Sequence, residues 1–297
     1  MPGSHKTKIR GLFTAMITPF DDRGRVDPDR IADLVRFQIS KGTEGLFPCG
    51  STGLGPMLNV DERKTVAESV IKASSGRIPV VVQVGCADTS STVELAKHAE
   101  RIGADAVATL TPYYYKPGEK AILKHFESVS KSVGLPVFAY NIPQFTGNNL
   151  QPSLVAMMAK EGILAGIKDS SRDFLNLLDL LEAVPEGFTV MNGTEEYGLF
   201  AIMSGAAGLV SGGASAVPEL FESLVAAQRA GDFKAALVAQ KTVQRLKDLV
   251  KTGPISAYYR ILLERGVDCG WPRGPLLPME EVDARRTIRE LRKLRLV

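Results

Sequence analysis

The sequence predicts an α/β fold, a (β/α)8 TIM barrel that carries a small C-terminal helical bundle. Short runs of β-branched and aromatic residues recur along the chain, and amphipathic stretches separate them. Eight such runs can be counted, which is the number that closes a parallel barrel. An open doubly wound sheet seldom reaches eight regular units and commonly carries a nucleotide fingerprint, which this chain lacks.

The expected strands follow one another along the chain at the spacing of successive βα units. They are Leu12–Pro19, Gly45–Pro48, Pro79–Val84, Ala106–Leu110, Val137–Asn141, Leu164–Lys168, Thr189–Asn192 and Gly208–Ser211. Helices are expected between them, for example at Asp27–Lys41, at Thr92–Ile102, and at Asp61–Ala73 with Asp61 as its N-cap.

After the last expected strand, the helical pattern continues through four more segments. These are Phe221–Arg229, Phe233–Leu249, Ile255–Gly266 and Val282–Leu294. Because this tail exceeds a single closing helix, we expect the barrel at residues 1–225 and a helical extension packed on it at residues 226–297. No linker or low-complexity segment indicates independent domains.

The composition is that of an ordinary globular protein, and we expect no nucleic-acid partner. Hydrophobic residues make up 44% of the chain, and 36 basic residues nearly balance 33 acidic ones. The basic residues cluster only near the C-terminus, where they interleave with Glu290 and apolar residues at helical spacing. A solvated helix face is the better interpretation, since tracking phosphates needs a broader basic surface.

We expect a cytoplasmic protein with no membrane partner. The three cysteines, Cys49, Cys86 and Cys269, are far apart and form no C-x-x-C pair, which fits reduced thiols. The segment Met1–Arg10 is polar and basic, without the apolar core and cleavage site of a secretory leader. No run approaches the roughly 18 apolar residues of a spanning helix.

Lys168 ends the sixth expected strand. Strand alternation places Leu164, Gly166 and Lys168 on one face, so an inward orientation of this set brings the amine into the barrel. Active sites of such barrels lie at the carboxyl ends of the strands. A lysine amine becomes nucleophilic when apolar walls disfavour its protonated form. The alternative is an ordinary lysine that pairs with Asp169.

Tyr140 ends the neighbouring expected strand. Adjacent parallel strands bring their carboxyl ends close together, so Tyr140 can reach the same cavity as Lys168 and exchange a proton there. The alternative is a core tyrosine whose hydroxyl group bonds to the backbone.

The loop Gly50-Ser51-Thr52-Gly53 follows the second expected strand. Its small residues, two hydroxyl groups and adjacent N–H groups suit a carboxylate. The segment from Gly45 to Thr52 has the spacing of a phosphate loop, but Ser51 stands where that motif requires lysine. Nucleotide binding is therefore not expected.

These motifs in this order resemble the dihydrodipicolinate synthase and N-acetylneuraminate lyase family, from Gly11 to the C-terminus. The resemblance rests on the following segments: Gly50-Ser51-Thr52-Gly53, Thr111-Pro112-Tyr113-Tyr114, Tyr140-Asn141-x-Pro143, Gly166-Ile167-Lys168-Asp169-Ser170 and Arg273-x-Pro275-x-x-Pro278. It implies a carbon–carbon lyase, a class I aldolase that needs no cofactor other than its own covalent imine.

The resemblance also implies the roles of individual residues. Lys168 would form a Schiff base with pyruvate, and Tyr140 would take the proton from the departing hydroxyl group, with Ser51 in a hydroxyl relay. Thr52 would hold the carboxylate of the keto acid. The iminium ion would act as the electron sink for carbon–carbon cleavage. No metal is required, and the three histidines, two of them in helical contexts, disfavour a metal-dependent aldolase.

Three further positions follow from the same resemblance. Tyr114 matches a catalytic tyrosine that enters the site of the neighbouring subunit, which implies a homotetramer, a dimer of dimers. Gly193 and Val210 match positions that line the pyruvate pocket. For Val210, simple barrel packing remains an equal alternative.

Departures from the family pattern indicate a sugar-acid aldolase. The synthases bind their aldehyde with an arginine two positions after the proline of the tyrosine motif, where this chain has Phe145. Leu54 replaces a frequent glutamate. The surrounding segments look most like the 2-keto-3-deoxygluconate aldolases, which cleave a sugar acid to pyruvate and an aldehyde. Lys116 is the candidate to replace the missing arginine, although a solvent-facing lysine is the favoured interpretation.

Glu195 and Glu196 align with acidic positions that bind sugar hydroxyl groups in the neuraminate lyases, and carboxylates accept such bonds well. Their alternative is a pair of solvated residues at a helix start. Three other functions stay open: a 4-hydroxy-tetrahydrodipicolinate synthase, a keto-acid dehydratase that uses the same imine, and a keto-acid-binding protein without turnover.

Overall fold

The computed structural model describes residues 9–297, in which eight parallel strands form one sheet. The strands lie in the order β2-β1-β8-β7-β6-β5-β4-β3, and a parallel bridge between Leu46 and Val80 closes the sheet into a barrel. Their bounds are β1 Gly11–Ala15, β2 Gly45–Phe47, β3 Val81–Gln83, β4 Ala106–Leu110, β5 Val137–Asn141, β6 Gly166–Asp169, β7 Thr189–Asn192 and β8 Gly208–Ser211. The predicted TIM barrel is confirmed.

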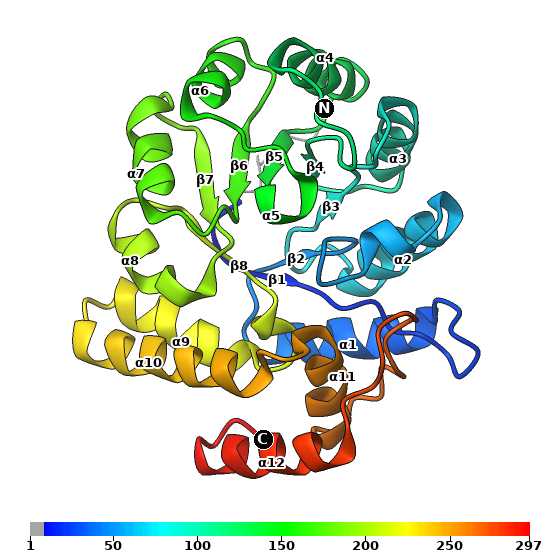
Figure 1. The fold of residues 1–297 in the computed structure, drawn as a ribbon, viewed down its shortest axis with the longest axis vertical. Helices are drawn as coiled ribbons and strands as arrows, with labels where there is room; N and C mark the ends of the chain where they lie inside the picture. The colour runs from blue at the N-terminus through cyan, green and yellow to red at the C-terminus, as the bar shows by residue number, and fades with distance from the viewer. Residues whose placement is uncertain (1–8) are drawn as a thin grey trace.

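Helices surround the strands, and the last helices gather on one side of the barrel (Figure 1). The helices up to β8 are α1 Pro28–Ser40, α2 Val60–Ser74, α3 Thr89–Arg101, α4 Glu119–Ser130, α5 Pro143–Thr146, α6 Pro152–Lys160, α7 Phe174–Ala183 and α8 Gly198–Met203. Those after β8 are α9 Pro218–Arg229, α10 Phe233–Val250, α11 Pro254–Glu264 and α12 Glu281–Lys293. None of the helices in the described part is both long and apolar enough to cross a bilayer.

Four strand predictions match the structure residue for residue, and four differ at their ends. β2 ends at Phe47 rather than Pro48, and β3 spans Val81–Gln83 rather than Pro79–Val84. β1 stops at Ala15 rather than Pro19, and β6 begins at Gly166 and includes Asp169. The expected cap of α2 is also wrong. Asn59, not Asp61, caps it, because the Asn59 side chain and Glu62 form a reciprocal capping box.

The apolar interior has two layers, one inside the barrel and one between the strands and the helices. The inner layer contains the aromatic residues Phe13, Phe47, Phe138 and Tyr140. Gly166 makes room for one of them, since a Cβ atom at this position would lie 2.3 Å from Cε1 of Phe138. The glycine before Lys168 therefore lets β6 pack closely on β5.

The division of the chain into a barrel and an extension stays a proposal. α9 runs from Pro218 to Arg229, across the predicted boundary at residue 225, so we propose that the extension begins after this helix. α10 packs along α9. Arg265, the C-cap of α11, bonds to the carbonyl group of Ala216 at 2.6 Å and pairs with Glu219 of α9.

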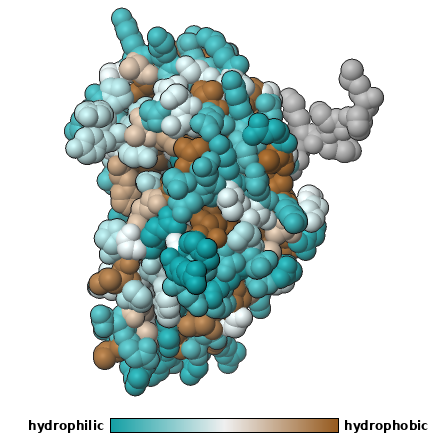
Figure 2. All heavy atoms as spheres, turned by 90° about the vertical axis from the view of Figure 1, so that its right-hand side faces the viewer, coloured by the Kyte–Doolittle hydropathy of each residue, from teal (hydrophilic) through white to brown (hydrophobic). Residues whose placement is uncertain are grey.

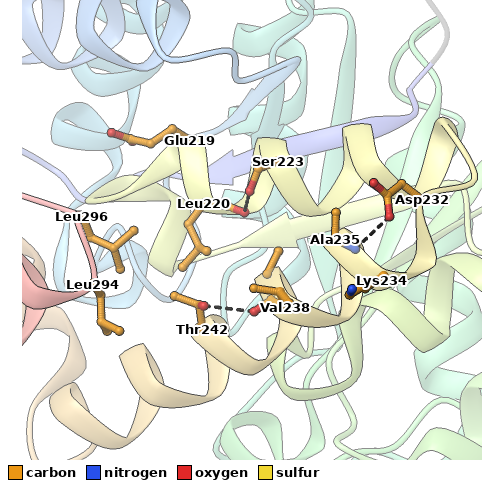
Figure 3. Close-up of a pocket in the computed structure, with 11 residues that line it drawn as sticks. Glu219, Leu220, Ser223, Asp232, Lys234, Ala235, Val238, Thr242, Leu294 and Leu296 are labelled. Carbon is orange, nitrogen blue, oxygen red and sulfur yellow. Dashed lines mark hydrogen bonds between the residues drawn. The ribbon is translucent and has the colours of Figure 1, made fainter.

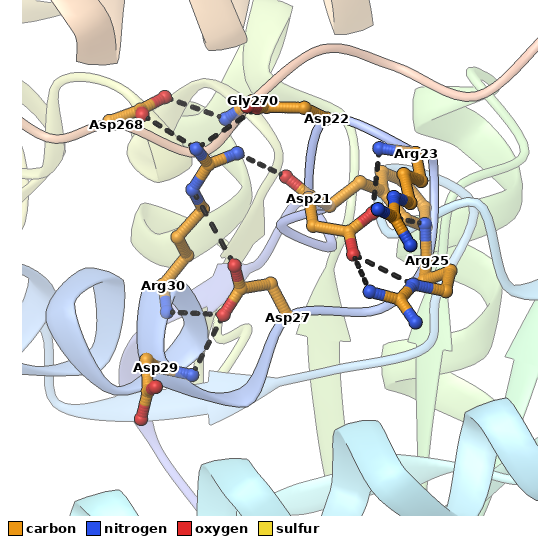
Figure 4. A network of polar contacts seen from close by, with 10 residues as sticks. Asp21, Asp22, Arg23, Arg25, Asp27, Asp29, Arg30, Asp268 and Gly270 are labelled. Atoms are coloured by element: carbon orange, nitrogen blue, oxygen red, sulfur yellow. Dashed lines mark hydrogen bonds and ion pairs between the residues drawn. The ribbon is translucent and has the colours of Figure 1, made fainter.

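Polar contacts tie the end of the chain to its beginning. Arg30 donates to the carbonyl group of Phe20 at 2.6 Å. Its guanidinium group also lies 3.0 Å from a carboxylate oxygen of Asp268 (Figure 4). Arg273 binds Glu62 and the carbonyl group of Gly24, at 2.6 and 2.7 Å. The late arginine-proline motif thus anchors the C-terminal segment over the barrel. On the face that Figure 2 shows, hydrophilic side chains predominate, and hydrophobic ones form separate patches.

Candidate active site

A cavity of about 510 Å³ lies at the carboxyl ends of the barrel strands. It brings together residues from loops and strands that are far apart in the chain. The candidate residues that line it are Ser51, Thr52, Tyr140, Phe145, Lys168, Gly193, Glu195, Glu196 and Val210. Nine of the ten predicted site residues therefore share one cavity.

Lys168 lies at the base of this cavity. Its backbone pairs with Tyr140 of β5 and Met191 of β7, and its side chain is buried. Nζ lies 4.0 Å from the ring centroid of Tyr140 and 4.5 Å from that of Phe47. No carboxylate of residues 9–297 forms an ion pair with this amine. The amine therefore faces aromatic rings rather than carboxylates.

Asp169 is not the partner of Lys168, because it points to the other side of β6. Its carboxylate accepts hydrogen bonds from Asn141 at 2.8 Å and from Ser171 at 2.7 Å. Burial raises the pKa of Asp169, although these bonds oppose the rise. The alternative in which Lys168 is an ordinary lysine paired with Asp169 is wrong for this structure.

Tyr140 is buried, and its hydroxyl group faces Ser51. The two oxygens lie 3.2 Å apart, which is within hydrogen-bonding distance. The ring of Tyr140 packs edge-on against Phe47, with centroids 5.8 Å apart. Tyr140 thus bonds to a side chain from another strand end, and the expected alternative of a backbone partner does not describe it.

The loop that carries Ser51 and Thr52 is held by tight backbone packing. Thr18 donates to the carbonyl group of Gly53 at 2.6 Å, and a Cβ atom on Gly55 would lie 2.0 Å from the carbonyl oxygen of Cys49. Only glycine fits that position. Both hydroxyl groups of the loop consequently lie at the cavity wall.

Gly193 confines the stem of Lys168. A Cβ atom on this residue would lie 2.0 Å from Oγ of Ser170 and 2.9 Å from Cε of Lys168. Its N–H group donates to the carbonyl group of Asp169 at 2.6 Å. Val210 lines the cavity and also belongs to the inner barrel layer, so both interpretations of this residue describe its position.

Glu195 is buried in the cavity wall rather than solvated at a helix start. Its Oε1 accepts hydrogen bonds from Ser211 Oγ at 2.8 Å and the Gly213 N–H group at 2.7 Å. Nζ of Lys247 lies 3.3 Å from Oε2 of Glu195 and 3.9 Å from Oε1 of Glu196. Burial raises the pKa of Glu195, but Lys247 and the hydrogen bonds outweigh it and hold that pKa below the ordinary value.

Sequence analysis missed two cations at this cavity. Lys247 comes from α10 in the C-terminal part of the chain, and Arg172 comes from the loop after β6. No local motif indicates either residue. The buried Gln240, about two helical turns before Lys247, donates to the carbonyl groups of Glu195 and Glu196, and so holds α10 against the site.

Tyr114 does not line the cavity of its own chain. Its side chain is 86% exposed, and its backbone has φ of 78°, a strained conformation for a tyrosine. Phe145 lies at the cavity rim and is 70% exposed. Lys116, the candidate to replace the missing arginine, is exposed and does not line the cavity.

Residues 9–297 contain no group of three metal-ligating side chains. Nε2 of His98 lies 2.8 Å from Glu68, and Nδ1 of His125 lies 2.9 Å from the Thr89 hydroxyl group. Burial lowers the pKa of His125 to about 4. His5 lies outside the described residues.

A second cavity of about 540 Å³ lies between α9, α10 and the end of the chain (Figure 3). Leu294 and Leu296 from the C-terminal segment line it. The carboxylate of Asp232 accepts a hydrogen bond from the N–H group of Ala235 and thereby caps α10. Glu219, Asp232 and Lys234 also line this second cavity, but none of the predicted site residues does, so the first cavity is the candidate active site.

Comparison with known proteins identifies close relatives over the whole barrel. A family model, the Dihydrodipicolinate synthetase family, matches residues 8–293. A 4-hydroxy-tetrahydrodipicolinate synthase of Maridesulfovibrio salexigens is 35% identical over 276 residues, which cover 92% of this chain and 94% of that protein.

Two solved structures share the architecture. YagE, a prophage protein of the dihydrodipicolinic acid synthase family from E. coli K12 in complex with pyruvate, is 29% identical with a TM-score of 0.93, over 97% of this chain and 99% of that one. CdNal from Clostridium difficile, in complex with mannosamine, is 25% identical with a TM-score of 0.93 and the same coverage of both chains.

Proposed function

The chain belongs to the dihydrodipicolinate synthetase family, and within this family we propose that it cleaves or forms 2-keto-3-deoxy sugar acids. Enzymes of this family are pyruvate-dependent class I aldolases and lyases, which work through a Schiff base to a lysine and use no cofactor. The chain is therefore an enzyme of this class, and a keto-acid-binding protein without turnover is no longer an alternative.

In the proposed reaction, Lys168 attacks the ketone of the substrate and water leaves, which forms an iminium ion. The ketone carbon is C2 of the substrate. The bond between C3 and C4 breaks, and its electron pair enters the iminium system to give an enamine. Tyr140 gives its phenolic proton to the water that leaves, and the resulting phenolate, supported by Ser51 at 3.2 Å, takes the proton from the C4 hydroxyl group as the aldehyde departs. The same proton of Tyr140 then goes to the enamine carbon. Protonation of the enamine and hydrolysis release pyruvate and the free lysine.

The observation that carries the lysine assignment is the aromatic pocket around Lys168. The amine lies over the ring of Tyr140, and the hydroxyl group of this same residue is the proposed proton carrier. Thr52 and Gly193 complete the wall on which the keto-acid carboxylate would lie. YagE, the structural relative bound to pyruvate, supports pyruvate as the keto acid.

Two features support a sugar acid as the substrate. Phe145 at the rim cannot form the charge-assisted bond that an arginine gives a carboxylate. Glu195 and Glu196, which line the same cavity, can accept hydrogen bonds from hydroxyl groups. A 4-hydroxy-tetrahydrodipicolinate synthase is the second candidate, because the relative from M. salexigens bears that name. A dehydratase would leave the carbon chain intact, so its product distinguishes it.

We also propose that the enzyme is a homotetramer in which Tyr114 enters a neighbouring subunit's site. The exposed ring and strained backbone of Tyr114 support this proposal, since strain persists where a side chain is needed in one place. Sedimentation should show four chains, and Tyr114→Ala should lower kcat without loss of fold.

Borohydride trapping tests the proposed lysine. Reduction in the presence of pyruvate should leave a stable secondary amine on Lys168, which peptide mass spectrometry locates. Lys168→Met should abolish the adduct, whereas Lys241→Met, on the exposed part of α10, should keep it. An adduct on another lysine, or none although pyruvate binds, would overturn the proposed chemistry.

A further inference from the structure

Arg172 is a charged residue at the rim of the active-site cavity, and it has no partner among residues 9–297. Its side chain is exposed and lines the cavity. Across the described part of the chain, no carboxylate pairs with this guanidinium group and no carbonyl group accepts from it. By contrast, Lys247 on the same cavity lies close to Glu195 and Glu196. The guanidinium group of Arg172 is therefore available to a bound molecule.

The backbone at Arg172 is strained. Its φ is 62°, in the left-handed region that glycine adopts easily and that other residues adopt at a cost. Such strain is typically kept where the side chain is needed for function. Arg295 near the C-terminus also has a positive φ of 59°, but it lies away from the cavity. The two arginines form a matched pair for experiments.

Arg172 acts on the same end of the cavity as Lys247. Burial lowers the pKa of Lys247, but the charges of Glu195 and Glu196 raise it, and the net result is a pKa above the ordinary value. The positive charge of Arg172 opposes this rise, so Arg172 lies close enough to Lys247 for the two charges to interact. A guanidinium fork suits carboxylates and phosphates, to which it can donate two parallel hydrogen bonds. The free cation at this end thus favours an anionic ligand.

We propose that Arg172 binds an anionic group, a carboxylate or a phosphate, at the far end of the aldehyde partner and thereby determines the substrate class. The inference rests on the proposed aldolase function and goes beyond it, because glyceraldehyde from 2-keto-3-deoxygluconate carries no such group. Aspartate semialdehyde also carries a carboxylate, but it differs from the aldehydes of sugar acids by an ammonium group, which would lie near the cations Arg172 and Lys247 as well as near Glu195 and Glu196.

Three aldehydes with the same three-carbon skeleton test the proposal. Each reacts with pyruvate: glyceraldehyde ends in a hydroxymethyl group, tartronate semialdehyde in a carboxylate and glyceraldehyde 3-phosphate in a phosphate. We expect kcat/KM for at least one anionic aldehyde to exceed that for glyceraldehyde about 10–100-fold, the range for a charged hydrogen bond. The preferred anion identifies which of the two groups is bound.

Arg172→Gly should remove that preference and also relieve the backbone strain. Its melting temperature should equal that of the wild type or exceed it by about 1–3 °C, which separates the loss of selectivity from any loss of fold. Arg172→Lys should keep part of the preference. Arg295→Gly relieves the same strain far from the cavity and should keep all of it.

The outcomes separate this inference from the proposed function. Equal kcat/KM for the three aldehydes, or a preference that survives in Arg172→Gly, would overturn the role of Arg172 while borohydride still traps pyruvate on Lys168. Failure of every aldehyde to react, together with no adduct on Lys168, would overturn the proposed function and the inference together.

Discussion

Replacing Gly193 by alanine is the most direct test of how the barrel positions Lys168. The backbone of Gly193 is outside the positive-φ region, so alanine changes only the volume at this point. The added Cβ atom would lie 2.9 Å from Cε of Lys168, whereas two carbon atoms normally lie about 3.5–4.0 Å apart. The stem of Lys168 must therefore shift by roughly 0.6–1 Å, and Ser170, whose Oγ would lie 2.0 Å away, must rotate.

A displacement of this size is large for a reacting group, because a misplacement of about 1 Å can reduce a rate about 100-fold. We expect Gly193→Ala to lower kcat for sugar-acid cleavage about 10–100-fold and to slow borohydride trapping of pyruvate. Overpacking of the barrel should cost about 1–3 kcal/mol of unfolding free energy. Steady-state kinetics and thermal unfolding measure the two effects.

Gly118→Ala is the matched control. Nothing lies within 4 Å of the Cβ atom that this change would add, so the rate of trapping and kcat should stay at wild-type values. If Gly193→Ala turned over as fast as the wild type, β7 would not confine the stem of Lys168, and the positioning role of Gly193 would have to be abandoned.

Three further predictions concern the proton carrier, the substrate and pH. Tyr140→Phe should still trap pyruvate but lose about 10²–10⁴-fold in kcat; a well-folded variant with wild-type turnover would return Tyr140 to a packing role. In one enzyme preparation, kcat/KM for cleavage of 2-keto-3-deoxy sugar acids should exceed that for condensation of pyruvate with aspartate semialdehyde about 10–100-fold, because Phe145 supplies no charge; the opposite order would refute the sugar-acid assignment. The pKa of histidine is about 6.5 in an unfolded chain, whereas burial lowers the pKa of folded His125 to about 4. The unfolded state therefore takes up the proton first as pH falls, and the free energy of unfolding should decrease by about 2 kcal/mol between pH 7 and 5. Chemical denaturation of the wild type and His125→Gln checks this, and parallel pH profiles would speak against it.

The order of elements could be predicted because it depends on local patterning. Runs such as Ala106–Leu110 and Val137–Asn141 are buried on both faces, and they therefore show as short apolar segments between amphipathic helices. The strand ends were harder to place. Asp169 continues β6 because its backbone pairs with Asn192 of β7, a contact made by a residue distant in sequence.

Strand alternation and the family motifs were sufficient to predict Lys168, Tyr140, Ser51 and Thr52 as neighbours. Each lies at or just after the carboxyl end of a strand, and parallel closure brings those ends together whatever the intervening loops contain. The sequence by itself thus determined the barrel, the end at which the site lies and the pair formed by Lys168 and Tyr140.

Only the tertiary structure decided what surrounds that pair. The charge of the buried Glu195 is paired with Lys247, which comes from a helix beyond the barrel, and no local pattern encodes such a distant contact. That Arg172 has no partner within residues 9–297 can be recognised only once the positions of the surrounding groups are known. Local sequence encodes backbone preference and periodicity, whereas burial, charge pairing and free donors depend on which elements meet after the chain has folded.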